Sequence, residues 1–465
     1  MSNFRDNPYR DLVYGVDIKV PLIDKSYCIG INFDNAATTP PLKSVIDEVV
    51  NFSPYYSSIH RGDGYKSQLS TYMYETSREI VKFFINDYSD MMDVIYVKNC
   101  TEAINKLAGI LANQDKESII LSTSMEHHSN DLPWRKNFEV KYIEVDDEGY
   151  LDMDDLKSKL EQYNGRISLV AITGASNVTG IKNPIYTIAN LAHSYGAKIL
   201  VDGAQLIPHS KFSIGLQLPL GPIDFVAFSA HKMYAPFGCG VLIGPKDFFN
   251  EYEPDHTGGG TIKFVSHDKV IWTASPDKEE AGSPNLIGSI TLGAAINELS
   301  KIGMSNIDEY EKYLTVYTTK HLQSIHSVKI YSNYSDFQNK VSIIPFNIEG
   351  IHHTIVAKIL AYEFGIAVRS GCFCAHPYLQ RLLKIPKSMI EEMTLASKDI
   401  QPGMVRISFG IYNTIDEIDK FLYAIKKIVD NKDYYTKKYS CTKETIPLDS
   451  FFLYILYNSL RTIDF

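Results

Sequence analysis

Short apolar runs alternate with amphipathic stretches between about residues 34 and 299. The near-continuous apolar runs predict buried strands, and the segments between them, with apolar residues three and four positions apart, predict helices. Apolar strands separated by helices are typical of a mostly parallel sheet that is covered on both faces. The predicted strands are Asp93–Lys98, Ser118–Thr123, Ser168–Gly174, Ala197–Gly203 and Asp224–Ala230, and the predicted helices are Thr101–Asn113, Asp155–Asn164 and Pro184–Gly196.

The pattern changes after about residue 300. NKVSIIPFNIEG and MVRISFGIYNT have strand character, HHTIVAKILAYEFG and IDEIDKFLYAIKKIVD have helical spacing, and IAVRSGCFCAHP reads as a strand followed by a loop. A lobe of this size is within the usual range of domains. We therefore predict an α/β fold with a large domain over residues 33–300 and a smaller α+β domain made of residues 1–32 and 301–430. The tyrosine-rich extension 431–465 has no predicted role.

Composition excludes several classes of partner. The chain has 465 residues, 45% hydrophobic composition, a net charge of −9 and a pI of about 5.8. No Lys/Arg-rich run stands out, which argues against nucleic acid and anionic membranes as partners. No apolar stretch approaches the ~18 residues of a membrane span, and the N-terminus lacks the apolar core of a secretory signal, so a cytoplasmic location is expected. Six cysteines in so long a chain do not indicate a disulfide scaffold.

Polar side chains follow the predicted strands at the points where the strands end. Asp202 and Gln205 follow one strand, and His231 and Lys232 follow the next, with a further short strand, Val241–Ile243, close behind. Because ligands of parallel sheets bind beyond the carboxyl ends of the strands, we expect these groups to meet in one crevice. Singly, the aspartate could cap a helix and the lysine could be an ordinary exposed one; together, they favour a site.

Three more features complete this set. His127 and Asn177 follow other strands, and a helix opens at Cys100 and Thr101. An enzyme that uses pyridoxal 5'-phosphate (PLP) needs a lysine for a Schiff base and a carboxylate for the pyridine nitrogen. A helix N-terminus with hydroxyls suits its phosphate. The sequence therefore predicts PLP as the cofactor.

A series of motifs occurs in a fixed order along the chain: FDNAATTP, CTEAIN, EHHSNDLPW, SNVTG, VDGAQ, FSAHKMYAPFGCGVLIG, EAGSPN and VRSGCFCA. This order resembles the class V aminotransferase-fold PLP enzymes, and within them the cysteine desulfurases of the SUF and selenocysteine lyase type. The resemblance covers roughly Asn32 to Asp430, and the motifs are highly specific in combination. It implies the PLP-dependent transferase fold (fold type I), with a mostly parallel, seven-stranded type of sheet in the large domain.

The resemblance also assigns roles. Lys232 would form the Schiff base, Asp202 would pair with the pyridine nitrogen and Gln205 would hydrogen-bond the phenolic oxygen. His127 would stack on the ring and shuttle protons, whereas His128 would be structural. Thr101, Ser229, His231 and the backbone near Cys100 would bind the phosphate, and Ser283 would reach the phosphate of the other subunit of a homodimer. Arg369, Asn177, Asn35 and Ala36 would bind the substrate, since an arginine fork suits a carboxylate.

The loop VRSGCFCAHPY indicates the reaction. Aligned on its R-[ST]-G start, Cys374 falls on the nucleophilic cysteine of the desulfurases. The implied reaction takes sulfur from L-cysteine as a persulfide on Cys374 and releases L-alanine, with Lys232 moving the Cα proton. A sulfur-acceptor protein is a further implied partner. Because the thiolate is the reactive form, a nearby positive charge or helix end should favour it.

This loop also departs from the family pattern. Common desulfurases of this type have two histidines where Cys372 and Phe373 stand, and GCFC is more similar to the N-terminal domain of molybdenum-cofactor sulfurases. Cys372 could relay the persulfide, form a disulfide with Cys374 or fill space. A metal site of Cys372, Cys374 and His376 is not predicted, because structural zinc needs four ligands and no further pair lies nearby.

Two other functions stay open from the sequence alone. A class V lyase, epimerase or aminotransferase acting on another amino acid would keep the cofactor, because one fold hosts many reactions. A non-enzymatic relic of the fold would serve only as a binding partner. The complete set of polar residues argues against the relic, and Cys374 favours the desulfurase.

Overall fold

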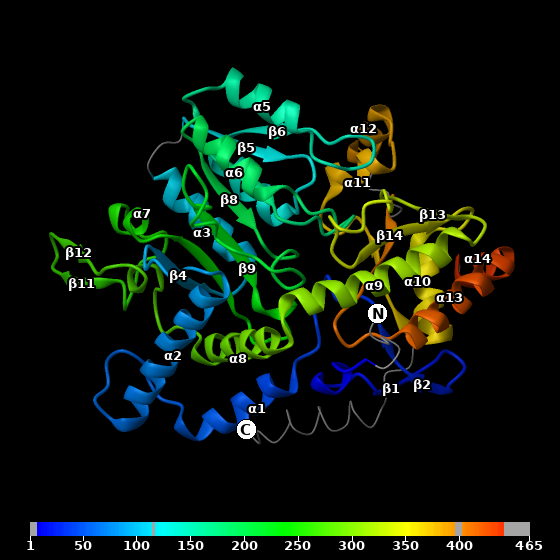
Figure 1. Ribbon diagram of the computed structural model, residues 1–465, viewed down its shortest axis with the longest axis horizontal. Coiled ribbons are helices and arrows are strands. Elements are labelled where there is room, and N and C mark those ends of the chain that lie inside the picture. The colour runs from blue at the N-terminus through cyan, green and yellow to red at the C-terminus, as the bar shows by residue number, and fades with distance from the viewer. Residues whose placement is uncertain (1–6, 114–116, 396–401, 441–465) are drawn as a thin grey trace.

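The computed structural model describes residues 7–113, 117–395 and 402–440. Its centre is a seven-stranded sheet with the strand order β4-β10-β9-β8-β7-β5-β6 (Figure 1). Strands β6, β5, β7, β8 and β9 are parallel neighbours, and β10 runs antiparallel to both β9 and β4. The strands are β4 (Met92–Val97), β5 (Ile119–Thr123), β6 (Glu139–Ile143), β7 (Ile167–Thr173), β8 (Lys198–Asp202), β9 (Phe225–Ser229) and β10 (Gly240–Pro245). The predicted mostly parallel α/β fold is confirmed.

Helices cover both faces of this sheet, because alternate residues of each strand feed two different cores. Val94 packs into one core and Ile95 into the other, although both belong to β4. One core is formed with α1 (Lys43–Phe52), α2 (Tyr65–Phe84), α5 (Met153–Gln162), α6 (Ile185–Ser194) and α8 (Leu286–Ile302). The other is formed with α3 (Cys100–Ala112), α4 (Leu132–Asn137) and α7 (Lys246–Glu251). This two-sided burial explains why the strands lack a polar face.

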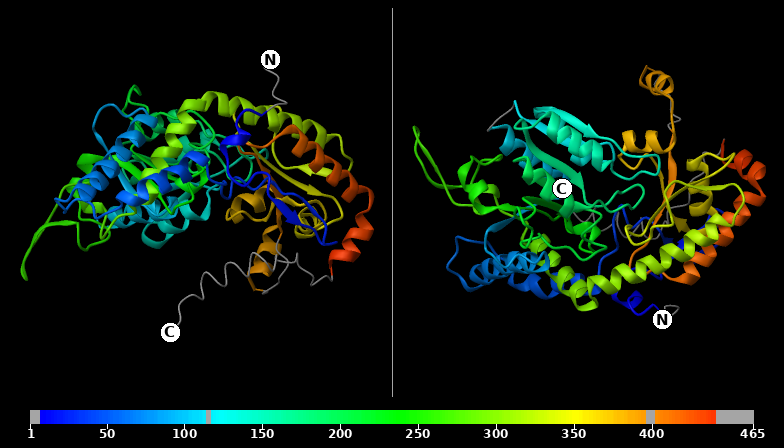
Figure 2. Two further views of the ribbon diagram at one scale, coloured as in Figure 1. Left: turned by 90° about the horizontal axis from the view of Figure 1, so that it is seen from below. Right: turned by 45° about the horizontal axis from the view of Figure 1, so that its top comes forward.

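A second lobe has its own core around a four-stranded sheet of order β13-β14-β17-β16. The helix α9 (Met304–Gln323) runs from the large sheet toward this lobe (Figure 2). The lobe's strands are β13 (Val328–Ile330), β14 (Ile343–Ile348), β16 (Arg369–Gly371) and β17 (Met404–Ser408). Its helices are α10 (His353–Phe364), α11 (His376–Leu382), α12 (Lys387–Leu395), α13 (Ile415–Asp430) and α14 (Lys432–Ser440).

The N-terminal segment lies on the second lobe. The hairpin of β1 (Lys19–Pro21) and β2 (Tyr27–Ile29) precedes β3 (Ile31–Asn32), which pairs in parallel with β15 (Ile366–Ala367). This contact agrees with a small domain that includes the N-terminus, although the domain boundaries themselves stay a prediction. Within the described ranges, no helix combines the length and the apolar character needed to cross a bilayer.

Some elements have no counterpart in the sequence predictions. The edge strand β6 and the hairpin of β11 (Ile262–Val265) and β12 (Val270–Trp272) were not predicted. Short 3-10 turns cover Arg10–Leu12, Ser53–Tyr55, His128–Asn130, Ala230–Lys232 and Asp277–Glu279. Of the extension that had no assigned role, α14 packs against α10 and buries Tyr435 and Tyr439 in the second core. Residues 441–465 lie outside the described residues.

Gly240 lets the start of α3 approach the sheet closely. A Cβ on Gly240 would lie 2.6 Å from the Cα of Asn99 and 2.9 Å from the carbonyl oxygen of Phe228. Both of these neighbours are backbone atoms, which cannot rotate out of the way. Asn99 in turn caps α3, because its Oδ1 accepts a hydrogen bond from the N–H of Glu102 at 3.0 Å. The absence of a side chain at Gly240 therefore allows the α3 N-terminus to lie directly against β10.

Replacement of Gly240 should destabilise the protein. We expect Gly240→Ala to lower the free energy of unfolding by roughly 1–3 kcal/mol, the usual cost of forcing extra atoms into packed structure. Gly259→Ala is the matched control, because a Cβ there meets nothing within 4 Å. Thermal and urea unfolding would measure both variants. Equal stability of the two variants would contradict the close approach.

Candidate active site

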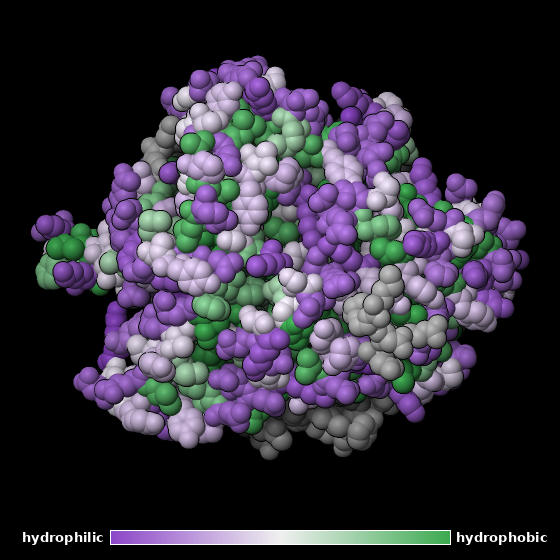
Figure 3. All heavy atoms as spheres, in the orientation of Figure 1, coloured by the Kyte–Doolittle hydropathy of each residue, from purple (hydrophilic) through white to green (hydrophobic). Residues whose placement is uncertain are grey.

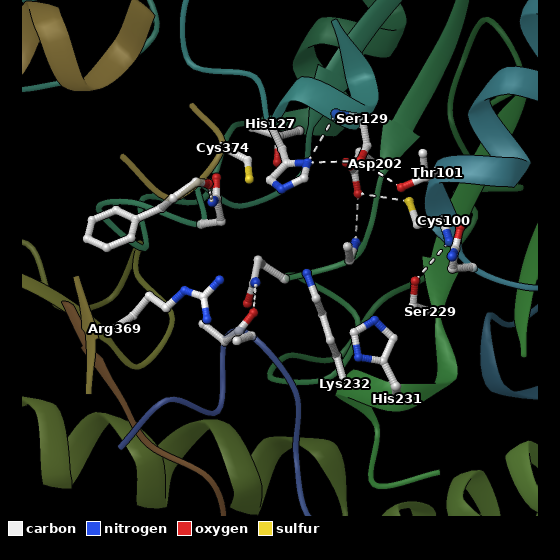
Figure 4. A pocket seen from close by; sticks show the side chains of 18 of the residues that line it. Cys100, Thr101, His127, Ser129, Asp202, Ser229, His231, Lys232, Arg369 and Cys374 are labelled. Atoms are coloured by element: carbon white, nitrogen blue, oxygen red, sulfur yellow. Dashed lines mark hydrogen bonds between the residues drawn. The ribbon is translucent and has the colours of Figure 1, made fainter. Parts of the chain in front are cut away.

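A cavity of about 250 Å³ lies where the carboxyl ends of the large sheet meet the second lobe (Figure 4). Residues from β8, β9 and the start of α3 form one wall, and residues from β16, β17 and the loop after β16 form the other. Most of the residues predicted from sequence line this cavity: Ala36, Cys100, Thr101, His127, Asn177, Asp202, Gln205, Ser229, His231, Lys232, Arg369 and Cys374.

Asp202 ends β8 and is almost fully buried. Its Oδ1 accepts hydrogen bonds from the N–H of Ala204 at 2.9 Å and from the thiol of Cys100 at 3.3 Å. These two bonds fix the carboxylate and direct its other oxygen to the cavity. Burial raises the pKa of Asp202, and the bond from Ala204 and the charge of Lys232 act in the opposite direction. A carboxylate held in this way is suited to pair with a cationic ring nitrogen.

Lys232 enters the cavity from the turn that follows β9, and its amine faces the same space as His127 and Cys374 (Figure 4). Burial lowers the pKa of the Lys232 amine, and the charge of Asp202 raises it in part. A lowered pKa increases the share of neutral amine, which is the nucleophilic form. The position after a buried strand therefore makes Lys232 suited to act as a nucleophile in this cavity.

The N-terminus of α3 supplies a cradle for an anion. The N–H of Cys100 donates to Ser229 Oγ at 2.8 Å, which leaves the hydroxyl hydrogen of Ser229 available to a ligand. Thr101 Oγ1 and Ser129 Oγ are hydrogen-bonded at 2.7 Å on the same side of the cavity. Helix N-termini with such hydroxyls bind phosphate groups. Ser129 was not predicted; its position directly after the histidine pair was the available signal.

His127 lies over the cavity as a neutral ring. The N–H of Ser129 donates to His127 Nδ1 at 3.1 Å, so the proton of the neutral imidazole is on Nε2. Burial lowers the pKa of His127 to about 3, and the charge of Lys232 contributes to the same shift. On the opposite wall, Gln205 Nε2 donates to the carbonyl of Ala36 at 2.7 Å, and Gln205 Oε1 is buried without a partner among the described residues. This orphan atom marks a place for a polar ligand group.

The loop after β16 carries Cys374 at the cavity. Cys374 is exposed and lines the cavity, and it adopts a left-handed conformation with φ of 56°, as Phe373 does with φ of 55°. Two consecutive residues other than glycine in this region are unusual and need support from their surroundings. The support comes from Asn177 Nδ2, which donates to the carbonyl of Phe373 at 2.7 Å, and from the N–H of His128, which donates to the carbonyl of Cys374 at 2.7 Å.

Cys372 takes a different direction from Cys374. It does not line the cavity and packs instead at the edge of a small apolar cluster that includes Met125 and Tyr378. The arrangement favours the space-filling interpretation of Cys372 over a relay. Asn177 also differs from its predicted role, because its amide nitrogen is used to hold the cysteine loop.

Arg406 is a cavity residue that the sequence reasoning missed. It projects from β17, is 3% exposed, and donates from Nη1 to the carbonyl of Asn177 at 2.9 Å and from Nη2 to Asp34 Oδ1 at 3.0 Å. Burial lowers the pKa of Arg406, and the charge of Asp34 opposes this shift. By contrast, the side chain of the predicted Arg369 is 55% exposed and lies 3.7 Å from Asp34. The signal for Arg406 was a lone arginine in the apolar run MVRISF.

Two predicted residues do not reach the cavity. Asn35 is fully buried, and its side chain bonds to the carbonyl of Ser408 and to the side chains of Asn413 and Tyr412. It therefore supports the backbone beside Ala36 and does not face a substrate. Ser283 is exposed and lies at a separate surface depression. Its predicted contact with the other subunit stays a prediction.

Residues 31–421 match the family described as aminotransferase class-V. The chain belongs to this family. It is 34% identical to a cysteine desulfurase of Shigella sonnei, and the match covers 85% of this chain and 92% of the relative. It is also 34% identical to a probable cysteine desulfurase of Halalkalibacterium halodurans, and that match covers 87% of this chain and 94% of the relative. The apo structure of a cysteine desulfurase from Thermococcus onnurineus superposes with a TM-score of 0.77 at 33% identity, over 86% of this chain and 95% of that one. The structure of the cysteine desulfurase CsdA of Escherichia coli superposes with a TM-score of 0.74 at 28% identity, over 86% of this chain and 95% of that one.

Enzymes of the class-V family use PLP, and the cavity fits that group. Asp202 offers a fixed carboxylate, the α3 N-terminus offers amides and hydroxyls, and Lys232 offers a buried amine. The orphan acceptor of Gln205 provides a further polar contact. These donors and acceptors match the ring nitrogen, phosphate, aldehyde and ring hydroxyl of the cofactor in chemical type.

His127 should make the cofactor-free protein less stable in acid. The folded protein keeps His127 neutral to about pH 3, whereas the ordinary histidine pKa is about 6.5. Between these values the unfolded chain binds an additional proton, so the free energy of unfolding falls as pH falls, by up to about 1.4 kcal/mol per pH unit. We expect His127→Asn to reduce this slope between about pH 6 and 4 in urea titrations. An unchanged slope would contradict a neutral, buried His127.

Proposed function

We propose that this chain is a PLP-dependent cysteine desulfurase, which takes sulfur from L-cysteine as a persulfide on Cys374 and releases L-alanine. The observation that carries the proposal is the position of the Cys374 thiol, which lines the same cavity as Lys232, Asp202 and His127. A desulfurase needs a thiol close to the base that removes the Cα proton of the substrate. The names of the relatives support the same reaction.

Arg406 is the proposed anchor for the substrate carboxylate. It is the buried arginine of the cavity, and it is held by Asp34 and by the carbonyl of Asn177. Its Nε is buried without a partner among the described residues, so part of the fork is still available for a ligand. A guanidinium binds a carboxylate more strongly away from water than at the surface. Arg369 also lines the cavity but its side chain is exposed, so it is suited to attract the carboxylate of an incoming substrate.

Lys232 is the proposed base at the substrate Cα. Its pKa is lowered by burial, which increases the share of neutral amine that can accept a proton. Bound PLP supplies the aldehyde that carries the substrate and the conjugated ring that accepts electrons. Asp202 would hold the ring nitrogen in its protonated form, and His127 would line the same cavity as a neutral ring.

Cys374 is the proposed acceptor of sulfur. Its thiolate attacks the substrate Sγ, forming an S–S bond while the Sγ–Cβ bond breaks. The electron pair of the broken bond stays with the substrate carbon, which takes up a proton and leaves as alanine. The exposure of Cys374 supports onward transfer, since an acceptor thiol can approach from solvent. A sulfur-acceptor protein is therefore part of the proposal.

We also propose that the protein acts as a homodimer. The hairpin of β11 and β12 projects from the body and presents apolar side chains, visible at the left of Figure 3. Phe264, Val265, Val270 and Ile271 are all exposed on it, and the predicted inter-subunit contact Ser283 is exposed as well. Such a patch favours contact with a protein partner. The SUF or selenocysteine lyase subtype and the cytoplasmic location stay predictions from the sequence.

Cys374→Ser should remove desulfurase activity. The hydroxyl is a poor nucleophile toward sulfur, so we expect alanine and sulfide release to fall at least about a hundredfold, while the absorbance of the bound cofactor is kept. Cys372→Ser is the matched control and should retain most of the activity, because Cys372 packs away from the cavity. Alanine and sulfide would be measured with L-cysteine and a reductant. Undiminished release by Cys374→Ser would refute a persulfide on that residue.

The two arginines should differ in their effect on substrate binding. Arg406→Lys loses the fork geometry in a buried place, and we expect KM for L-cysteine to rise about tenfold or more. Arg369→Lys keeps a positive charge at an exposed place and should change KM by only about twofold. Initial rates over a range of cysteine concentrations separate the cases. The reverse order would assign the carboxylate to Arg369.

A further inference from the structure

Two histidines join the segment behind His127 to the helix that follows the cysteine loop. The backbone N–H and the Nδ1 of His376, at the first position of α11, both lie near His128 Nε2, at 3.4 Å and 3.1 Å. The two rings are parallel within 4°, with their centroids 4.9 Å apart. His128 also donates its own N–H to the carbonyl of Cys374 at 2.7 Å. His128 therefore contacts the chain on both sides of Ala375.

The protonation state of His128 follows from these contacts. A backbone amide only donates, so His128 Nε2 accepts, and the ring is neutral with its proton on Nδ1. His376 Nδ1 then donates to the same nitrogen. Burial lowers the pKa of His128, and His376 and Arg135 add to this effect, whereas Asp131 opposes it. These are the charged groups that face the ring from α11 and from the segment through α4.

Protonation of His128 would break the arrangement. Its Nε2 would then carry a hydrogen that faces two other donors, the amide and the Nδ1 of His376. The loop needs this contact because Phe373 and Cys374 occupy left-handed backbone conformations. Asn177 fixes the loop only at Phe373, one residue before the reacting thiol.

We propose that His376 is a positioning residue that, through neutral His128, holds the Cys374 thiol in the cavity for sulfur transfer, and that acid releases it. This inference rests on the proposed desulfurase function for its kinetic consequence. The clamp itself, defined as His128 and His376, is a property of the resting protein. It restrains the loop on the side opposite to Asn177.

The test uses two replacements of His376. His376→Asn keeps a nitrogen donor on Cγ, at the same distance along the side chain as Nδ1, whereas His376→Leu fills similar space without a donor. His326→Leu, at an exposed histidine between α9 and β13, is the control. Deuterium exchange of the peptide covering residues 372–379 would be measured on each resting protein, with correction for intrinsic rates.

We expect this peptide to exchange about fivefold faster or more in His376→Leu, and at the unmodified rate in His376→Asn and His326→Leu, as loss of one hydrogen bond predicts. Lowering the pH from about 7.5 to about 5 should speed exchange in the unmodified protein and have a smaller effect in His376→Leu, which has lost the side-chain contact to His128 and keeps only the backbone amide contact. Equal exchange in the Leu and Asn variants, or no pH effect in the unmodified protein, would overturn the proposal.

Kinetics separate positioning from a simple helix cap. We expect His376→Leu to lower kcat for alanine release from L-cysteine about tenfold with KM changed by less than about twofold, and His376→Asn to restore kcat. Exchange of the Cα hydrogen of L-alanine in deuterium oxide, which needs Lys232 and no thiol, should be unaffected. Equal losses in both reactions would mean general distortion and would refute the positioning role. If the unmodified protein released no alanine, the proposed function would fail, and the exchange measurement would still decide the clamp.

Discussion

The burial of an amine and a carboxylate at the ends of adjacent strands is the constraint on which this structure depends. β8 and β9 are parallel neighbours, so Asp202 at the end of one and Lys232 just beyond the other enter the same space. Each group alone would be costly to bury, and each shifts the pKa of the other toward the charged form. Helices cover both faces of the sheet, so water cannot reach these two groups through the sheet itself. The opening to the second lobe is then the route by which a ligand can reach them.

The second lobe completes this space with groups that the large sheet cannot provide. Cys374 and Arg406 come from β16, β17 and the loop after β16, and each is tied back to the large lobe. Asn177 contacts both segments, through its side chain to the carbonyl of Phe373 and through its own carbonyl to Arg406. The position of the thiol relative to the lysine is thus set by contacts between lobes. A change in the approach of the lobes would change the chemistry without altering any reacting residue.

Sequence alone predicted the central part of the fold because burial leaves a strong pattern there. The five predicted parallel strands correspond to β4, β5, β7, β8 and β9, although β4 turned out to pair antiparallel with β10. The strand β6 was missed because, at the edge of the sheet, most of its residues are partly exposed and the apolar run is interrupted. The hairpin of β11 and β12 has almost no buried residue and so carries no such signal. The spacing of apolar residues reflects burial, so a strand with few buried residues cannot be predicted from it.

The candidate site was predictable where motif residues follow strands, and less so where distant segments meet. Asp202, Lys232, His127 and Cys374 lie at the cavity as expected. Arg406 depends on Asp34, which is far away in sequence, so its burial could not be inferred from its neighbours. Asn35 was misassigned because a motif position does not reveal which way a side chain turns. The pairing of His128 with His376 likewise exists only in three dimensions.

The antiparallel course of β10 has a thermodynamic consequence. Ser229 and Gly240 are direct cross-strand partners, so the turn that carries Lys232 is closed at its base by the sheet itself. The conformational entropy of the segment between Ser229 and Gly240 is lost during folding, before any ligand binds. An incoming ligand therefore meets an amine whose backbone is already fixed, and little of its binding free energy is spent on ordering the chain. Preorganisation of this kind favours tight retention of a small group through many turnovers.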